Sequence, residues 1–436
     1  MSHRWPPAPA LSMRPPVLSG EPATSSRAVS PGLFNLLRPL LASIAAGCSS
    51  GLLFGYDIGA MASTASEVRA AFHLSPSGLG LAVSSALLGT VIGSLLAGSL
   101  ADSLGRRVTM ALASVLYLFA AVSAAISTGA PQFFCSRFVC GLAVGLLTVV
   151  APMYLAEIAP AERRGAIVGS FQLSLSFGVV CAFSAGYLSS LLAGAAATWR
   201  YDLCGGVLPA AFCLIALTGS KPGRLTSTDA PAREPLFQRR YLRPILLGLG
   251  LALFNQLTGV NALLYYVLDV FRGLGVEEIA GRRNAFLLAV MGLLITVSAL
   301  YFIDRAGRRF LLLTGAAGMG LCLLLVSLAG TRHWPAGIVL LLIAGYHAFF
   351  GFSQGSVVWV YLSEIFPPPV RARGQALAST VLWITNMLVV DIFPTLAYRY
   401  ENRIFSGLAI LLFVQLALIF VFYPETKGRT LASAAL

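Results

Sequence analysis

The chain has 436 residues, of which 57 % are hydrophobic and only 11 % are charged, and its mean hydropathy is +0.81. A soluble globular domain carries about a quarter charged residues, so this composition excludes a soluble enzyme or binding module and indicates an integral membrane protein. The formal net charge of +13 would suit nucleic acid, but Lys and Arg concentrate in alternate loops, which is typical of membrane topology.

Residues 1–39 are rich in Pro, Ser and Arg and lack the apolar core of a signal peptide, which predicts a disordered cytoplasmic tail. Twelve apolar runs of membrane-spanning length follow. We expect six-helix bundles at residues 40–219 and 244–423, a basic cytoplasmic linker at 220–243 and a cytoplasmic tail at 424–436. The expected spans are Leu40–Ala60, Leu79–Ala101, Val108–Thr128, Pro131–Leu155, Ala166–Ser190, Leu203–Gly219, Pro244–Val270, Ala285–Ile303, Phe310–Leu328, Gly337–Leu362, Gln375–Ala397 and Ile404–Tyr423.

The bias of Lys and Arg toward one set of loops predicts that both termini are cytoplasmic. The seven cysteines lack metal-ligand spacing, and the chain has neither a phosphate-binding glycine loop nor a nucleophile motif. We therefore expect no metal, no cofactor and no enzymatic activity.

The first span contains an ionisable residue, Asp57, and the fourth contains the only cation expected inside the membrane, Arg137. Ionisable residues at that depth are costly and usually functional. Desolvation favours the protonated form of a buried carboxyl, whereas a neighbouring arginine favours the ionised form, so the proton affinity of Asp57 would depend on how the helices are arranged. The alternative is a permanent structural ion pair that never titrates.

Two pairs of loop sequences repeat along the chain. ADSLGRR follows the second span and IDRAGRR the eighth, and their aspartates are 304 − 102 = 202 residues apart. YLAEIAPAERRG begins at Tyr154 and YLSEIFPPPVRARG at Tyr361, which are 361 − 154 = 207 residues apart. Nearly equal offsets indicate a six-span unit that occurs twice in the same orientation. An intermediate offset of 261 − 57 = 204 residues places Asp57 opposite Asn261.

The repeated loops carry both acids and arginines. Bidentate pairs between these groups can close the cytoplasmic end of a central cavity; alternatively they are topology determinants whose exposed pairs contribute about 0 to 1 kcal/mol each. We predict a cytoplasmic gate that comprises Asp102, Arg106, Arg107, Glu157, Arg163, Arg164, Asp304, Arg308, Arg309, Glu364, Arg371 and Arg373.

The seventh span, FNQLTGVNALLYY at residues 254–266, contains several uncharged polar residues in an apolar run. Asn255, Thr258 and, within one residue, Asn261 recur at helical spacing, so they can share a face. Gly259 permits close approach or local unwinding. Unpaired amides in hydrocarbon cost several kcal/mol, so these groups must face a cavity that suits a polyhydroxylated solute or, alternatively, bond to neighbouring helices.

In this order, the motifs resemble the sugar porters of the major facilitator superfamily, which include facilitative glucose transporters and proton–sugar symporters. The resemblance covers about residues 40–430 and rests on FGYDIG at Phe54, RFVCGLAVG at Arg137, QLTGVNALLYY, WVYLSEIFP at Trp359, PETKG at Pro424 and the repeated loops. It implies an all-α fold of twelve transmembrane helices in the plasma membrane or the bacterial inner membrane.

The resemblance also implies a sugar held at the membrane midplane, since amides bond hydroxyl groups and an indole covers the apolar face of a sugar. The implied substrate-binding residues are Gln172, Asn255, Gln256, Asn261, Trp359 and Asn386, with Phe54, Tyr265 and Trp383 lining the site. Asp57 and Arg137 match the proton-coupling pair. The chain departs from the family pattern at Asn255, Gly292 and Ser356, where Gln, Asn and Pro are usual.

The resulting hypothesis is import of a monosaccharide, a hexose or pentose, together with a proton by alternating access. A passive sugar uniporter is the nearest alternative, and a non-transporting sugar sensor and a proton-coupled drug antiporter are weaker ones. The expected partners are the sugar, the proton and the lipid bilayer; nucleic acid is not expected, and a single chain is expected to suffice.

Overall fold

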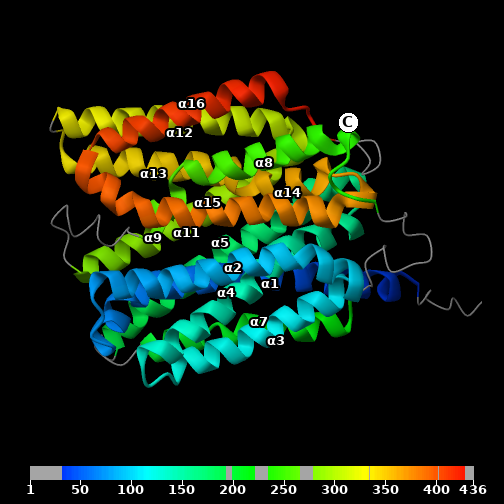
Figure 1. Ribbon diagram of the computed structural model, residues 1–436, viewed down its shortest axis with the longest axis horizontal. Coiled ribbons are helices and arrows are strands. Elements are labelled where there is room, and N and C mark those ends of the chain that lie inside the picture. Colours follow the sequence, from blue (N-terminus) through cyan, green and yellow to red (C-terminus); the bar gives the residue numbers. More distant parts are fainter. Residues whose placement is uncertain are drawn as a thin grey trace, which may run out of the picture.

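The computed structural model describes residues 32–192, 199–220, 234–265, 278–332, 334–400 and 402–427. Within these residues, twelve helical segments are long and apolar enough to cross a membrane, and they lie side by side with roughly parallel axes (Figure 1). Helices satisfy their backbone N–H and C=O groups internally, as a lipid environment requires. The predicted all-α fold of twelve membrane spans is confirmed, and the chain is a multi-pass integral membrane protein.

Helices from the first half of the chain lie on one side of the molecule and helices from the second half on the other (Figure 1). The first half comprises α1 (Gly32–Ala71), α2 (Pro76–Leu104), α3 (Arg106–Ala125), α4 (Ala130–Ile158), α5 (Arg164–Leu192), α6 (Trp199–Cys204) and α7 (Val207–Thr218). The second comprises α8 (Leu242–Leu257), α9 (Val260–Tyr265), α11 (Glu278–Ala306), α12 (Arg308–Thr331), α13 (Ala336–Phe352), α14 (Gln354–Ile365), α15 (Arg371–Tyr400) and α16 (Arg403–Phe422). Three 3₁₀ turns, at Ala161–Arg163, Arg239–Tyr241 and Pro368–Val370, lead into α5, α8 and α15.

Helix α1 is longer than predicted at both ends. It begins at Gly32 rather than Leu40, so residues 32–39 are not part of a disordered tail, and it continues to Ala71. The leucines at its start favour helix, and Pro39 is accommodated inside it, as prolines are in membrane helices. The rest of the predicted tail, most of the linker and the chain beyond Lys427 lie outside the described residues.

Three of the predicted spans are each built from two helices. The sixth breaks at Gly205–Gly206 between α6 and α7, the seventh at Thr258–Gly259 between α8 and α9, and the tenth at Ser353 between α13 and α14. Gly259 has φ = +81°, a left-handed backbone that glycine adopts without steric cost. The predicted unwinding at Gly259 is confirmed, whereas the other two breaks were not expected.

Close helix packing within and between the halves brings the functional side chains together. Gly89 of α2 and Gly141 of α4 have no room for a Cβ, because the backbones of Phe138 and Ala86 lie against them; small residues at such contacts let membrane helices approach closely. Between the halves, α5 packs on α11 and α2 packs on α15. The interior between these two pairs holds the candidate site.

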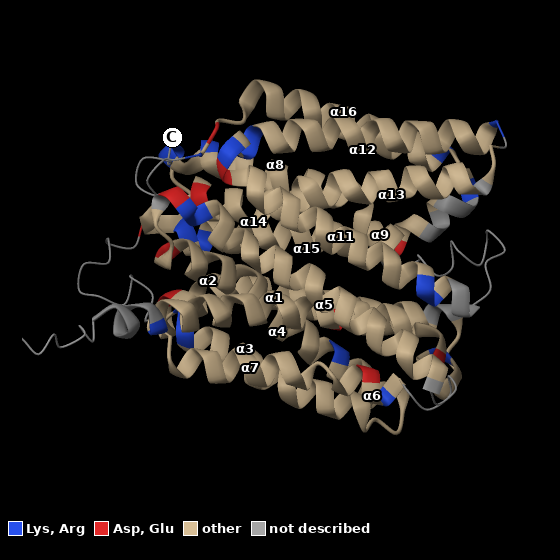
Figure 2. Cartoon of the chain, turned by 180° about the vertical axis from the view of Figure 1, so that it is seen from behind, with Lys and Arg blue, Asp and Glu red and all other residues tan. Residues whose placement is uncertain are grey.

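Charged residues lie mainly at the two ends of the bundle. Figure 2 shows Lys, Arg, Asp and Glu gathered most densely at the end where the described chain finishes, while the middle of the bundle is almost free of them. This is the end that the sequence analysis assigned to the cytoplasm, and it is called the cytoplasmic end below. The opposite end is called the outer end.

Candidate functional site

A cavity of about 160 Å³ lies between the two halves, with walls from both. It is lined by Phe54, Gln172, Asn255, Gln256, Asn261, Trp359 and Trp383, all of which were predicted to bind or surround a substrate. Residues from α1 and α5 therefore face residues from α8, α9, α14 and α15.

One predicted substrate residue, Asn386, is not on this wall. Asn386 is only 1 % exposed and does not line the cavity; within the described residues its side-chain amide has no hydrogen-bond partner. It lies almost one turn farther along α15 than Trp383, so the position that the resemblance implied for it at the substrate differs from its position here. The side chain of Tyr265 lies outside what the structure describes.

The amides of the seventh span bond to one another in a chain across the break between α8 and α9. Asn261 Nδ2 donates to Gln256 Oε1 at 2.8 Å, Gln256 Nε2 donates to Asn255 Oδ1 at 2.9 Å, and Asn255 Nδ2 donates to the carbonyl of Gln354 at 3.5 Å. Each amide has further donor or acceptor capacity. This series of hydrogen bonds thus fixes the orientation of the amides and leaves donors and acceptors available to a hydroxylated ligand.

Thr258 does not share the cavity face. The predicted face assumed one continuous helix, but α8 ends at Leu257, and the Thr258 hydroxyl donates to the carbonyl of Asn255 at 2.8 Å. Thr258 therefore stabilises the end of α8, and the prediction of a shared face is wrong for this residue.

Two tryptophans connect the halves across the cavity. Trp359 Nε1 donates to Gln172 Oε1 at 2.9 Å, and Trp383 Nε1 donates to Thr148 Oγ1 at 3.2 Å. Trp383 also meets the ring of Phe54 edge-on, with 5.4 Å between centroids. Both indoles are thus held in place with a face or edge at the cavity, as a sugar-stacking ring requires.

Asp57 and Arg137 form a buried bidentate ion pair, with distances of 2.6 Å from Nη1 to Oδ1 and 3.0 Å from Nη2 to Oδ2. Tyr117 also donates to Asp57 Oδ1, at 3.1 Å, a contact that the sequence analysis missed. The ion pair lines a smaller pocket whose walls include Phe54 and Trp383. Because these two rings also line the main cavity, the ion pair is one layer of side chains away from it.

The predicted gate contains the same cluster twice, once in each half. Arg106 contacts Asp102 at 3.3 Å and Glu157 at 3.2 Å, and donates to the carbonyl of Ala101 at 2.8 Å. In the second half, Arg308 contacts its counterparts at matching positions: Asp304 at 2.8 Å, Glu364 at 2.9 Å and the carbonyl of Ile303 at 3.1 Å. Both arginines are buried, at 4 % and 1 % exposure.

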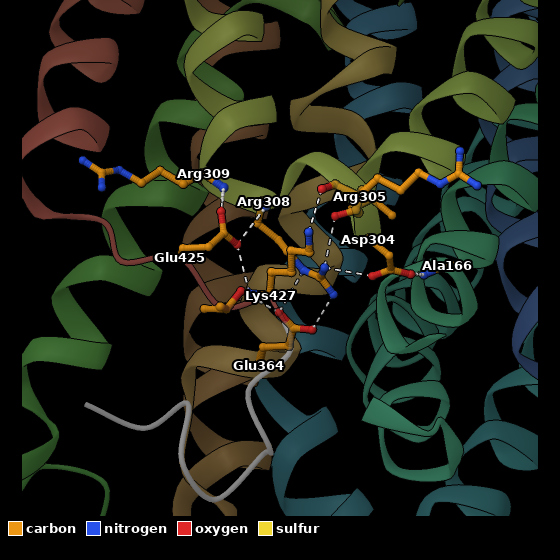
Figure 3. Close-up of polar contacts among 10 residues, drawn as sticks. Ala166, Asp304, Arg305, Arg308, Arg309, Glu364, Glu425 and Lys427 are labelled. Atoms are coloured by element: carbon orange, nitrogen blue, oxygen red, sulfur yellow. Dashed lines mark hydrogen bonds and ion pairs between the residues drawn. The ribbon is translucent and has the colours of Figure 1, made fainter. Parts of the chain in front are cut away.

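The second cluster has additional partners from the chain after α16 (Figure 3). Glu425 accepts hydrogen bonds from the backbone N–H groups of Arg308 at 2.9 Å and Arg309 at 3.0 Å, so it caps the start of α12. Thr426 donates to Glu364 Oε2 at 2.6 Å, and Lys427 Nζ donates to the carbonyl of Arg305 at 2.6 Å. The terminal PETKG motif therefore completes this cluster.

Contacts of charged side chains at the cytoplasmic end join the halves directly. Asp304 Oδ2 accepts from the backbone N–H of Ala166 at 2.9 Å, and Arg373 Nε lies 4.0 Å from Asp102 Oδ2. Arg371 of the second half also lies close enough to Glu157 of the first half for the two charges to attract each other. Three members of the predicted gate make hydrogen bonds within their own half. Arg107 donates to the carbonyl of Leu217, Arg309 to that of Phe420 and Arg371 to that of Phe366, while Arg164 is buried and Arg163 exposed.

The outer end has an ion pair between the halves that the sequence analysis missed. Arg282 of α11 contacts Glu67 of α1 at 2.8 Å and donates to the carbonyl of Ser63 at 3.3 Å, and both charged side chains are buried. Glu67 lies beyond the predicted end of the first span, so only the extra length of α1 brings it to Arg282.

The cavity wall also contains polar residues that were not predicted, namely Ser176, Thr296 and His347. The hydroxyls of Ser176 and Thr296 are 3.2 Å apart across the halves. His347 stands in the apolar run LLIAGYHAFF, and an ionisable side chain at such a position is a functional hypothesis by default. That rule would have identified it.

Comparisons with known proteins find sugar transporters, which agrees with the geometry of the site. A family model described as "Sugar (and other) transporter" matches residues 42–219 and 224–435. The chain is 30 % identical to the D-xylose-proton symporter of Escherichia coli K12 over 87 % of this chain and 92 % of that protein. It is 29 % identical to the arabinose-proton symporter of Bacillus subtilis over 90 % and 93 %, and 31 % identical to the glucose transport protein of Synechocystis over 87 % and 94 %.

Solved structures of a sugar transporter are also similar to this chain. The proton:xylose symporter XylE bound to 6-bromo-6-deoxy-D-glucose superposes with a TM-score of 0.82 at 27 % identity, covering 91 % of this chain and 98 % of that chain. The inward open conformation of XylE from E. coli gives 0.73 at 27 % identity over 91 % and 99 %. The weaker match to the inward open form agrees with the contacts that join the halves at the cytoplasmic end here.

Proposed function

The chain belongs to the family of sugar (and other) transporters, and from that premise we propose that it imports a monosaccharide together with a proton by alternating access. The single observation that carries the proposal is the buried Asp57–Arg137 ion pair, whose pocket shares the side chains of Phe54, Ile58 and Trp383 with an amide-lined and indole-lined cavity. The relatives named as proton symporters of xylose and arabinose support the same conclusion.

The sugar site consists of the amides of Gln172, Gln256 and Asn261 and the indole of Trp359. Sugar hydroxyls donate to and accept from the amides, while the indole covers an apolar face of the ring. Binding replaces the bond between Trp359 and Gln172 by bonds to the sugar, which draws the two halves onto the ligand.

Proton coupling follows from the environment of Asp57. Beside Arg137 the carboxylate is stabilised in its ionised form; if helix movement separates the pair, desolvation favours protonation. A proton is then taken up on one side of the membrane and released on the other.

The two ends of the cavity act as alternating barriers. The proposal is supported by contacts between the halves at both ends: Asp304 to Ala166 and Arg373 to Asp102 at the cytoplasmic end, and Arg282 to Glu67 at the outer end. We assign the outer pair as the barrier that must open to admit sugar, and the cytoplasmic contacts as the barrier that must open to release it. Each can open only while the other holds.

Purified protein in vesicles tests the proposal. Labelled D-xylose, L-arabinose and D-glucose are offered with and without an imposed pH gradient, acidic outside. Accumulation that requires the gradient supports symport. Equilibration without accumulation indicates a uniporter, and absence of uptake and binding of every sugar overturns the proposal.

A further inference from the structure

His347 lines the cavity and carries a covered acceptor that no described residue uses. Its Nδ1 lies 3.0 Å from the carbonyl of Ile343, and because a carbonyl only accepts hydrogen bonds, Nδ1 must carry the proton. In the neutral ring, Nε2 is then a bare acceptor. Nε2 is buried and has no partner among the described residues, and His347 lines the cavity.

Gly292 leaves room on the same wall. A Cβ placed on Gly292 would meet no atom within 4 Å, although the residue lies on α11 in the cavity lining. Gly351, one turn after His347 on α13, faces the carbonyl of Gly292 and the hydroxyl of Thr296. The acceptor of His347 and the space at Gly292 therefore lie on adjoining turns of two packed helices.

This wall is level with the amides. Tyr346, the neighbour of His347, donates to the carbonyl of Thr258 at 2.8 Å, so this turn of α13 lies against the break between α8 and α9. Asn255 and Asn261 flank that break and line the cavity. A sugar ring held by the amides would therefore direct a substituent toward Gly292 and His347.

Resting on the proposed function, we propose that His347 and Gly292 form a subsite for the exocyclic hydroxymethyl group of a hexose. The CH₂ fills the space beside Gly292, and its hydroxyl donates to His347 Nε2. A pentose leaves both the space and the acceptor empty, and a buried acceptor without a partner is unfavourable. The subsite makes the protein selective for hexoses over pentoses.

Three sugars separate the parts of this subsite. D-xylose differs from D-glucose by the hydroxymethyl group, and 6-deoxy-D-glucose keeps the carbon but lacks the hydroxyl. Affinities are measured with each purified variant, and D-xylose serves as an internal measure of whether the site is intact. The wild type should bind D-glucose about tenfold more tightly than either of the other two.

His347→Phe keeps a ring but removes the acceptor. It should weaken the binding of D-glucose by about tenfold and leave the affinities for D-xylose and 6-deoxy-D-glucose unchanged. His347→Gln supplies another acceptor and should restore part of the loss. Gly292→Val fills the space, so it should weaken the binding of both D-glucose and 6-deoxy-D-glucose and leave the affinity for D-xylose unchanged. Gly407→Val is the matched control, because Gly407 also has open space at its Cβ but is exposed on α16.

Equal affinity of the wild type for the three sugars, or equal losses for all three in His347→Phe, would overturn the subsite while leaving sugar transport standing. Failure of the wild type to bind any of the three would overturn both proposals. Binding that follows the expected pattern without dependence of uptake on a pH gradient would support the subsite and refute proton coupling.

Discussion

The two halves of the molecule share their cytoplasmic clusters but differ at their centres. Arg106 and Arg308 each bind an aspartate four residues earlier and a glutamate from a later helix. At the membrane centre, however, the first half has Asp57 paired with Arg137, whereas the second has Asn261 bonded to Gln256. At the offsets of the repeat, Arg137 corresponds to residues 339–344, VLLLIA, which contain no cation.

This difference assigns separate tasks to two copies of one architecture. In the proposed mechanism, the similar clusters let both halves respond together when the cytoplasmic end opens. The ion pair of the first half responds to the proton, while the neutral amides, most of which belong to the second half, bind sugar without a cost that varies with pH.

Replacing Asp57 by Asn would make the centres alike, and this change and its companion Arg137→Ala should have the largest effects. The Asp57→Asn variant keeps a hydrogen-bonding group but cannot titrate, so accumulation should vanish. At 100 mV, one coupled charge contributes about 2.3 kcal/mol, which supports roughly fifty-fold accumulation. Uptake against a gradient and exchange of labelled for unlabelled sugar are the two measurements, and exchange should survive.

Arg137→Ala is the companion variant. It leaves the buried carboxyl without its partner, so accumulation should again vanish, and exchange should fall as well, because breaking a buried pair costs about 3–5 kcal/mol. Continued accumulation by Asp57→Asn would remove the coupling role. A wild type that never accumulates sugar would make the pair structural.

Substitutions in the two arginine clusters of the cytoplasmic end should have the next largest effect. Glu157→Gln and Glu364→Gln each remove the negative charge that pairs with a buried arginine. Each should therefore favour opening at the cytoplasmic end. A cysteine at Ala372, which is 3 % exposed and lies against Gly98 of the other half, should react faster with a water-soluble thiol reagent. Glu364→Gln should act more strongly, since Thr426 also depends on that carboxylate. Unchanged reactivity in both would exclude a gating role.

The amides should have a moderate effect. Gln256→Ala and Asn261→Ala each strand a bonded neighbour and should weaken sugar binding by about 1–3 kcal/mol. Because Gln256 bonds to both Asn255 and Asn261, its loss should be the greater of the two. Equilibrium binding of D-glucose is the measurement, and unchanged affinity in both variants would return these residues to a packing role.

Arg373→Ala should have the smallest effect. Arg373 lies 4.0 Å from Asp102 and its side chain is 42 % exposed, and such pairs contribute about 0 to 1 kcal/mol. We expect less than a threefold change in labelling at Ala372→Cys. A change as large as that of Glu364→Gln would show that this single contact between the halves dominates closure.

Much of this architecture could be predicted from the sequence, because spans, repeats and buried polar residues leave local patterns. The Asp57–Arg137 pair was predictable because Arg137 was the only cation within the predicted spans. The Glu67–Arg282 pair was not, because Glu67 was assigned to a loop. Helix breaks at Ser353 and Gly205–Gly206, and the burial of Asn386 away from the cavity, depend on tertiary packing that spacing does not encode.

The bond from Trp359 to Gln172 has a consequence for which solutes are refused. A molecule that enters between them separates a buried donor from a buried acceptor, and each is unfavourable without a new partner. A hydroxylated ring offers a new partner to both groups, whereas an apolar molecule of the same size offers a partner to neither. The cavity thereby screens solutes by their capacity for hydrogen bonding, even though most of the residues that line it are apolar.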